Sequence, residues 1–134
     1  MSNNQRSELS KRSKYWMPRN RYLELKNFCL QYKDWKLAIK EIALLKAHIA
    51  QNTSGILGDP TEQMAIKRLR YERNIQLVED TAILADPTIA KWLLKGVTEN
   101  YSYEYLHYKL DLPAGRDLYY DRYRRFFWLL DQRQ

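Results

Sequence analysis

Apolar residues recur every three or four positions along most of this chain, the spacing that lets a helix bury one face. In residues 34–50 the apolar stripe comprises Trp35, Ala38, Ile42, Leu45 and Ile49. In residues 60–85 it comprises Met64, Tyr71, Ile75, Val78 and Ala82. No stretch alternates apolar and polar residues for long, so strands are not expected. The pattern predicts an all-α fold of about five to six helices, with 34–50 and 60–85 packed as an antiparallel helical hairpin.

Proline and capping residues indicate where the helices begin. The tripeptide Asp-Pro-Thr occurs twice, at residues 59–61 and 86–88. Each copy offers an Asp as the N-cap and a Pro for the first helical position, where its missing N–H costs nothing. Pro18 suits the first turn of an earlier helix, and Asp34 and Ser102 can cap the helices that follow them.

The C-terminal part of the chain, about residues 98–131, has the pattern of a helix-turn-helix. A short helix, YEYLHYKL (103–110), is followed by the break DLPAG (111–115) and by a longer helix from Arg116 to about Asp131. A short helix, a turn containing Gly and a second, basic helix are the elements of this DNA-binding motif in their usual order.

A helical wheel divides the side chains of the last helix into two groups. The apolar side, which we expect to face the core, holds Tyr119, Tyr123, Phe126, Phe127 and Leu130. Arg122, Arg124 and Arg125 lie off this side. Arg116 and Asp117 stand at the helix start, where the second helix of a helix-turn-helix meets base edges. DNA binding is therefore predicted, while a solvated charged face stays open as the simpler alternative.

The positive charge of the chain lies mainly at its two ends. The net charge is +7, with seven bases and two acids in residues 1–26 and five bases and three acids in residues 116–134. A basic chain attracts nucleic acids, anionic membranes or acidic proteins. One electropositive surface would require the fold to bring the two ends together. Residues 1–14 are polar and lack periodicity, so we expect a flexible basic arm there and a single helical domain over 15–134.

The sequence lacks the residue groups of an enzyme. Cys29 is the only cysteine, which excludes an intramolecular disulfide and a thiolate metal cluster. His48 and His107 have no second His, Cys or acid at metal-binding spacing. There is no Gly-rich phosphate loop, no signal peptide and no apolar run near the roughly 20 residues of a membrane span. We therefore expect no catalytic residue, metal, cofactor, small-molecule substrate or membrane association. We expect a cytoplasmic location.

Three segments carry a resemblance to a known family. DPTEQMAI (59–66) and LDLPAGRDLYYDRYRRFFWLL (110–130) resemble the phage transcriptional activators of the RinA and ArpU type, and YLELKNFCLQYKDWKLAIKEI (22–42) is similar to their N-terminal helices. The resemblance covers about residues 20–131. It implies a sigma-factor-like helix-turn-helix that binds promoter DNA of a phage, prophage or other mobile element and assists RNA polymerase in a bacterial cell. It also implies a recognition helix that contains Arg116, Tyr119, Tyr120, Arg122, Arg124 and Arg125.

Double-stranded DNA is thus the expected partner, and RNA polymerase and a second copy of the chain are further candidates. Two other roles remain open. One is a DNA-binding protein like the small terminase subunits of phage packaging, which assemble into rings. The other is a helical protein-interaction module that does not bind DNA and whose basic surface meets an acidic protein. A further possibility is a plain domain of four to six helices in which the apolar stripes of 34–50 and 60–85 serve dimerisation.

Overall fold

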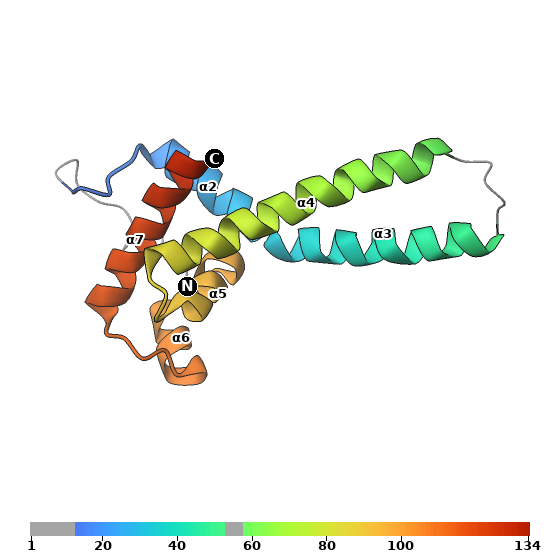
Figure 1. Ribbon diagram of the computed structural model, residues 1–134. Helices are drawn as coiled ribbons and strands as arrows, with labels where there is room; N and C mark the ends of the chain where they lie inside the picture. Colours follow the sequence, from blue (N-terminus) through green and yellow to red (C-terminus); the bar gives the residue numbers. More distant parts are fainter. Residues whose placement is uncertain (1–12, 53–57) are drawn as a thin grey trace. The chain divides into compact units, whose positions relative to one another are not determined.

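Helices account for nearly all of the structure. The computed structural model describes residues 13–52 and 58–134, without the side chains of residues 52 and 58–60. In these residues there is no strand, and the six helices are α2 (Arg19–Leu30), α3 (Tyr32–Asn52), α4 (Gly58–Ala85), α5 (Ala90–Glu99), α6 (Tyr103–Leu110) and α7 (Arg116–Arg133) (Figure 1). The predicted all-α class and the predicted number of helices are confirmed.

The chain forms two compact units where the sequence suggested a single helical domain over residues 15–134. One unit comprises Met1–Gln31 together with Leu77–Gln134, and the other comprises Tyr32–Gln76. The boundary between them falls inside α4, which has 28 residues. A helix of that length extends about 42 Å, so a single small core does not cover all of it. Most of the expected basic arm, residues 1–12, lies outside the described residues.

The unit Tyr32–Gln76 is the predicted helical hairpin. Within it α3 and the first part of α4 run in opposite directions (Figure 1). Its buried apolar side chains are Tyr32, Trp35, Ile42 and Met64. Leu45, which was predicted to lie in the apolar stripe, is 49% exposed. The hairpin therefore has a thin interior, and one expected contributor to it faces solvent.

The other unit has an aromatic core centred on α7. The five side chains on the predicted apolar side of this helix are at most 1% exposed, namely Tyr119, Tyr123, Phe126, Phe127 and Leu130. Helix α2 packs against α7 through Tyr22, whose ring meets Phe127 edge-to-face at 5.2 Å and whose Oη lies 3.1 Å from Tyr123 Oη. The helical wheel thus predicted the buried side of α7 correctly.

The helix starts agree only partly with the predicted caps. Ser102 caps α6, because its Oγ accepts a hydrogen bond from Tyr105 N at 3.2 Å. The second Asp-Pro-Thr does not begin a helix at Pro87, since α5 starts at Ala90. Instead Asp86 Oδ1 accepts a hydrogen bond from Thr88 N at 2.9 Å, which closes a turn before the helix.

Two other predicted caps have different outcomes. The expected Asp59 cap of α4 falls on side chains outside the described residues. Asp34 lies in the first turn of α3 rather than ahead of it, because that helix already begins at Tyr32.

Candidate nucleic-acid interface

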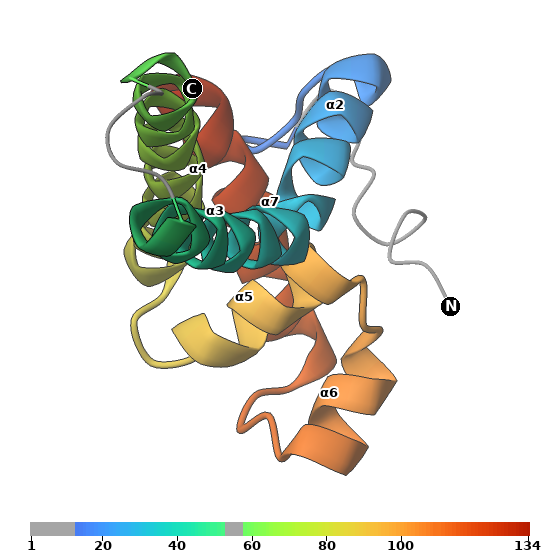
Figure 2. The same cartoon turned by 90° about the vertical axis from the view of Figure 1, so that its right-hand side faces the viewer.

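The turn between α6 and α7 is held by side chains of α5 and α6. It leads from α6 to the start of α7 (Figure 2). One carbonyl group at the end of α6 and two in the turn accept hydrogen bonds from side chains: Leu110 O from Trp92 Nε1 at 2.6 Å, Leu112 O from His107 Nδ1 at 3.0 Å, and Ala114 O from the Tyr103 hydroxyl at 2.9 Å. Because a carbonyl only accepts, Nδ1 is the protonated nitrogen of His107.

Backbone geometry adds to this restraint. Asp111 follows α6 in the left-handed conformation, with φ 60°, as helix C-caps often do. Leu112 N then donates to Leu106 O at 2.9 Å and ties the turn back to α6. The side chain of Leu112 is buried, at 1% exposure. The turn therefore fixes the direction in which α7 leaves α6.

The start of α7 is exposed but its arginine is not unpaired. Gly115 is the N-cap residue and supplies no side-chain cap. Arg116 forms an ion pair with Glu104 of α6, and its guanidinium lies over the Tyr103 ring at 5.1 Å. Asp117 and Leu118 are exposed beside it. An exposed ion pair of this kind contributes about 0–1 kcal/mol, so Arg116 can exchange it for another anion at little cost.

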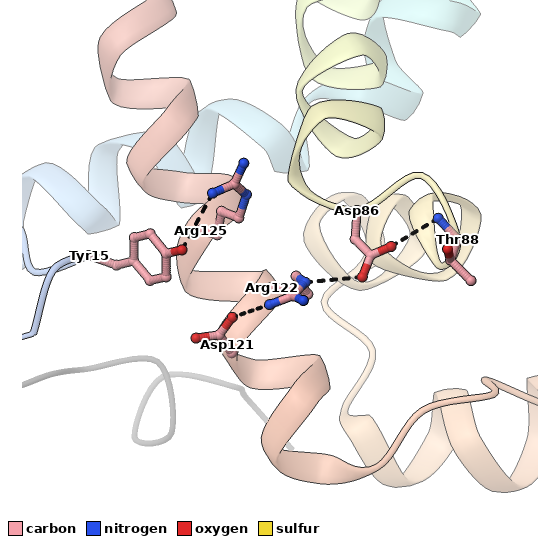
Figure 3. A network of polar contacts seen from close by, with 6 residues as sticks. All are labelled: Tyr15, Asp86, Thr88, Asp121, Arg122 and Arg125. Carbon is pink, nitrogen blue, oxygen red and sulfur yellow. Dashed lines mark hydrogen bonds and ion pairs between the residues drawn. The ribbon is translucent and has the colours of Figure 1, made fainter.

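Arg122, the first of the three predicted outward arginines, bridges two carboxylates. Its Nε donates to Asp86 Oδ2 at 3.0 Å and its Nη1 donates to Asp121 (Figure 3). Burial by itself lowers the pKa of Arg122, but the hydrogen bonds to Asp86 and Asp121 outweigh this and raise it. Since Asp86 also closes the turn before α5 through Thr88, Arg122 connects α7 to that turn. The hydrogen bonds of Arg122 therefore hold parts of the fold together.

Arg125 meets the N-terminal segment instead. Its Nη1 donates to Tyr15 Oη at 3.5 Å (Figure 3), and the Tyr15 ring lies 5.9 Å from that of Trp128. Tyr15 is 8% exposed as a result. Arg124 is half-buried on the same side of the helix. The second half of α7 is thus partly covered by the segment that precedes α2.

Two of the predicted contact residues are in the core. Tyr119 and Tyr120 are 0% and 5% exposed, so neither ring is accessible to a nucleic acid in this structure. Three rings surround Tyr120: Tyr119 at 5.2 Å, Tyr123 at 6.1 Å and Tyr103 of α6 at 6.4 Å. A Cβ added at Gly96 would collide with the Tyr119 hydroxyl. Gly96 therefore allows α5 and α7 to approach closely.

The comparisons with other proteins give no further guidance. The chain matches no known protein family, no curated protein and no solved structure. In residues 13–52 and 58–134 there is no group of three or more His, Cys, Asp or Glu side chains that could hold a metal ion. Within the same ranges no helix is both long and apolar enough to cross a membrane.

Sequence reasoning missed the residues that shape this region. Trp92, Tyr103 and His107 hold the turn, and Tyr15 covers part of α7. Each of these side chains carries an N–H or O–H group that needs an acceptor once it is withdrawn from water. That need was the available signal that they would bond to other parts of the chain. Nothing in the residue spacing indicated which carbonyl groups they would reach.

Proposed function

We propose that the chain is a DNA-binding transcriptional regulator of a phage or other mobile element, acting through a helix-turn-helix formed by α6 and α7. The observation that supports this most is the restrained turn at residues 111–115. Base reading requires a helix held at a fixed angle, and three ring donors plus a buried leucine supply that restraint here. The resemblance to phage transcriptional activators supports the transcriptional role, in a bacterial cytoplasm and with RNA polymerase as a further partner.

Within this proposal the predicted contact residues take different roles. Arg116, at the exposed start of α7, is the best placed to read a base edge, together with Asp117. Arg122 keeps α7 attached to the turn before α5. Tyr119 and Tyr120 anchor the helix from inside. Arg124 and Arg125 lie too far along α7 for base reading and suit phosphate contacts.

Selection of bound duplexes from a random double-stranded library tests the proposal, at about 150 mM salt where non-specific contacts weaken. We expect a sequence to be enriched, and we expect Arg116→Ala to lower affinity for it by roughly 1–3 kcal/mol. Arg133→Ala, a removal of the same charge at the other end of α7, is the matched control. Weak, equal binding to all duplexes would count against sequence-specific regulation.

A second candidate function, a helical self-association module, is favoured by the hairpin. Five of its large apolar side chains are about half exposed or more: Leu37, Leu44, Leu45, Ile66 and Leu69. Contiguous exposed apolar surface often marks an interface. Light scattering distinguishes the alternatives, because a monomer argues against self-association and a ring of many copies favours a role like that of small terminase subunits.

A further inference from the structure

The fold brings the two basic ends of the sequence together. Tyr15 accepts a hydrogen bond from Arg125 (Figure 3). Its ring also packs on that of Trp128, so residue 15 is held against the second half of α7. Lys14, next to Tyr15, is exposed and its Nζ lies 5.0 Å from the Tyr15 ring. Lys14 and Arg125 therefore both lie beside the Tyr15 side chain.

Helix α2 adds to the same region. It packs against α7, and Arg21 Nε donates to Asp131 Oδ1 at 2.6 Å. Arg19, at the start of α2, is exposed. Arg124 precedes Asp131 by seven residues, which is nearly two full turns, so both lie on the side of α7 that Arg21 approaches.

The two halves of α7 consequently differ in electrostatic surroundings. Around the second half, six bases (Lys14, Arg19, Arg21, Arg124, Arg125 and Arg133) accompany two acids (Glu24 and Asp131). Around the first half, two bases (Arg116 and Arg122) accompany four acids (Glu104, Asp117, Asp121 and Asp86). The positive potential of this unit is therefore concentrated away from the start of α7.

We propose that Lys14, Arg19, Arg124 and Arg125, here termed the terminal basic surface, bind the phosphate backbone of double-stranded DNA. The inference rests on the proposed function, and it assigns affinity and base reading to different ends of α7. DNA-binding proteins commonly separate contacts that position the protein on phosphates from contacts that read bases. Arginine has five N–H donors, so Arg125 keeps donors for a phosphate while one is bonded to Tyr15.

An acidic protein is the less suitable partner. Protein interfaces depend on buried aromatic or apolar anchors surrounded by charges. In this region Tyr15 is buried against Trp128 in internal packing and is not available as an anchor. Cations contributed by three segments of the chain suit the phosphates of a duplex, which are contacted through charge and need no apolar anchor.

Fluorescence anisotropy with a labelled duplex and with poly-L-glutamate, over a range of salt concentrations, tests the inference. The surface variant is Lys14→Gln/Arg19→Gln/Arg124→Gln. The matched control, Lys67→Gln/Lys91→Gln/Lys95→Gln, removes the same charge from exposed lysines of α4 and α5, outside the proposed helix-turn-helix. We expect the surface variant to flatten the dependence of log K on log salt by up to roughly 2.7, about 0.9 for each lost phosphate contact, and the control to leave it unchanged.

The outcomes separate this inference from the proposed function. If the wild type binds no duplex at all, both fail. If the wild type binds a duplex but the surface variant and the control lose affinity equally, the role of the terminal basic surface is overturned and the proposed function stands. The same conclusion follows if poly-L-glutamate binds as tightly as the duplex. Circular dichroism checks that the variants fold. The double variant Lys14→Gln/Arg19→Gln leaves α7 unaltered, and it must show about two thirds of the change in the salt dependence of log K.

Discussion

At the scale of single residues, the arginines of α7 are not equivalent. Arg116 holds one exposed carboxylate, whereas Arg122 holds two, one of which also closes the turn before α5. The sequence placed Arg116 at the helix start and Arg122 off the apolar side, but it could not show which carboxylates each of them would bind. The difference gives each of them a separate expected behaviour on substitution.

Arg122→Lys keeps the charge but replaces a planar fork with a single ammonium, which cannot bridge Asp86 and Asp121 in the same geometry. We expect the free energy of unfolding to fall by about 1 kcal/mol, a modest value because the side chain is 33% exposed. Arg116→Lys is the matched control and is expected to stay within about 0.5 kcal/mol of the wild type. Urea unfolding measures both. Equal losses in the two variants would contradict a bridging role for Arg122.

The Tyr119 hydroxyl is buried and has no hydrogen-bond partner among the described residues. Leaving such a group unsatisfied costs about 1–3 kcal/mol. We therefore expect Tyr119→Phe to raise the free energy of unfolding by roughly 1 kcal/mol. Tyr123→Phe is the opposite case, because it removes the hydrogen bond to Tyr22 and should lower stability by about the same amount. Urea unfolding of the two variants under identical conditions decides the matter, and changes of the same sign would refute the assignment.

Alkaline pH should destabilise this unit through its buried acids. Burial raises the pKa of Cys29 and, above all other causes, those of Tyr119 and Tyr123. The folded state then keeps protons that the unfolded state releases, from about pH 8.5 for the thiol and about pH 10 for the phenols. Stability is complete below about pH 8.5 and falls above it, by up to roughly 1.4 kcal/mol per pH unit for the thiol.

Urea unfolding of the wild type and of Cys29→Ala between pH 7.5 and 9.5 tests this expectation. The range extends about one unit to either side of the ordinary pKa of a thiol. Other titrating groups affect the two proteins alike, so over this range the wild type should lose about 1.4 kcal/mol of stability relative to the variant. Parallel curves would show that Cys29 does not contribute.

At the scale of elements, the helices and the connections between them differ in how far the sequence determines them. Three-four spacing was enough for the buried side of α7, and the local cap at Ser102 was read correctly. The second Asp-Pro-Thr was misread because Arg122, 36 residues away, binds Asp86 while Thr88 closes its turn. Tyr120 was misassigned for a similar reason, since one of the rings around it, Tyr103, comes from α6 and is 17 residues away. Local chemistry is readable from spacing, whereas partners distant in sequence are not.

The turn between α6 and α7 permits a direct test of its restraint. Tyr103→Phe removes the hydrogen bond to Ala114 O but keeps the ring. We expect faster amide hydrogen exchange in residues 111–118 and weaker binding to a selected duplex, with the helical circular dichroism signal unchanged. Tyr105→Phe, on the exposed side of α6, is the matched control. If both variants exchange and bind alike, the hydroxyl of Tyr103 does not restrain the turn.

At the scale of the whole molecule, the two units differ in how much apolar surface they bury. The unit that contains α7 buries most of the large side chains, while the hairpin buries four and leaves Leu37, Leu44, Leu45, Ile66 and Leu69 largely exposed. Few buried contacts mean that the hairpin opens at a lower free energy than the other unit. A partner that binds the closed hairpin stabilises it, so the partner must raise the free energy of this local opening.

Amide hydrogen exchange at two protein concentrations tests this difference. At low concentration we expect residues 36–48 and 64–75 to exchange faster than the core of α7, because local opening needs less energy there. If a second copy covers the hairpin, protection of these residues must rise with concentration, and Leu37→Gln/Leu44→Gln must abolish the rise. Leu118→Gln, which alters an exposed leucine of α7, is the control and should not affect it. Protection that is independent of concentration in the wild type would mean that the hairpin associates with a different partner or with none, and would leave α7 as the main interacting element of the chain.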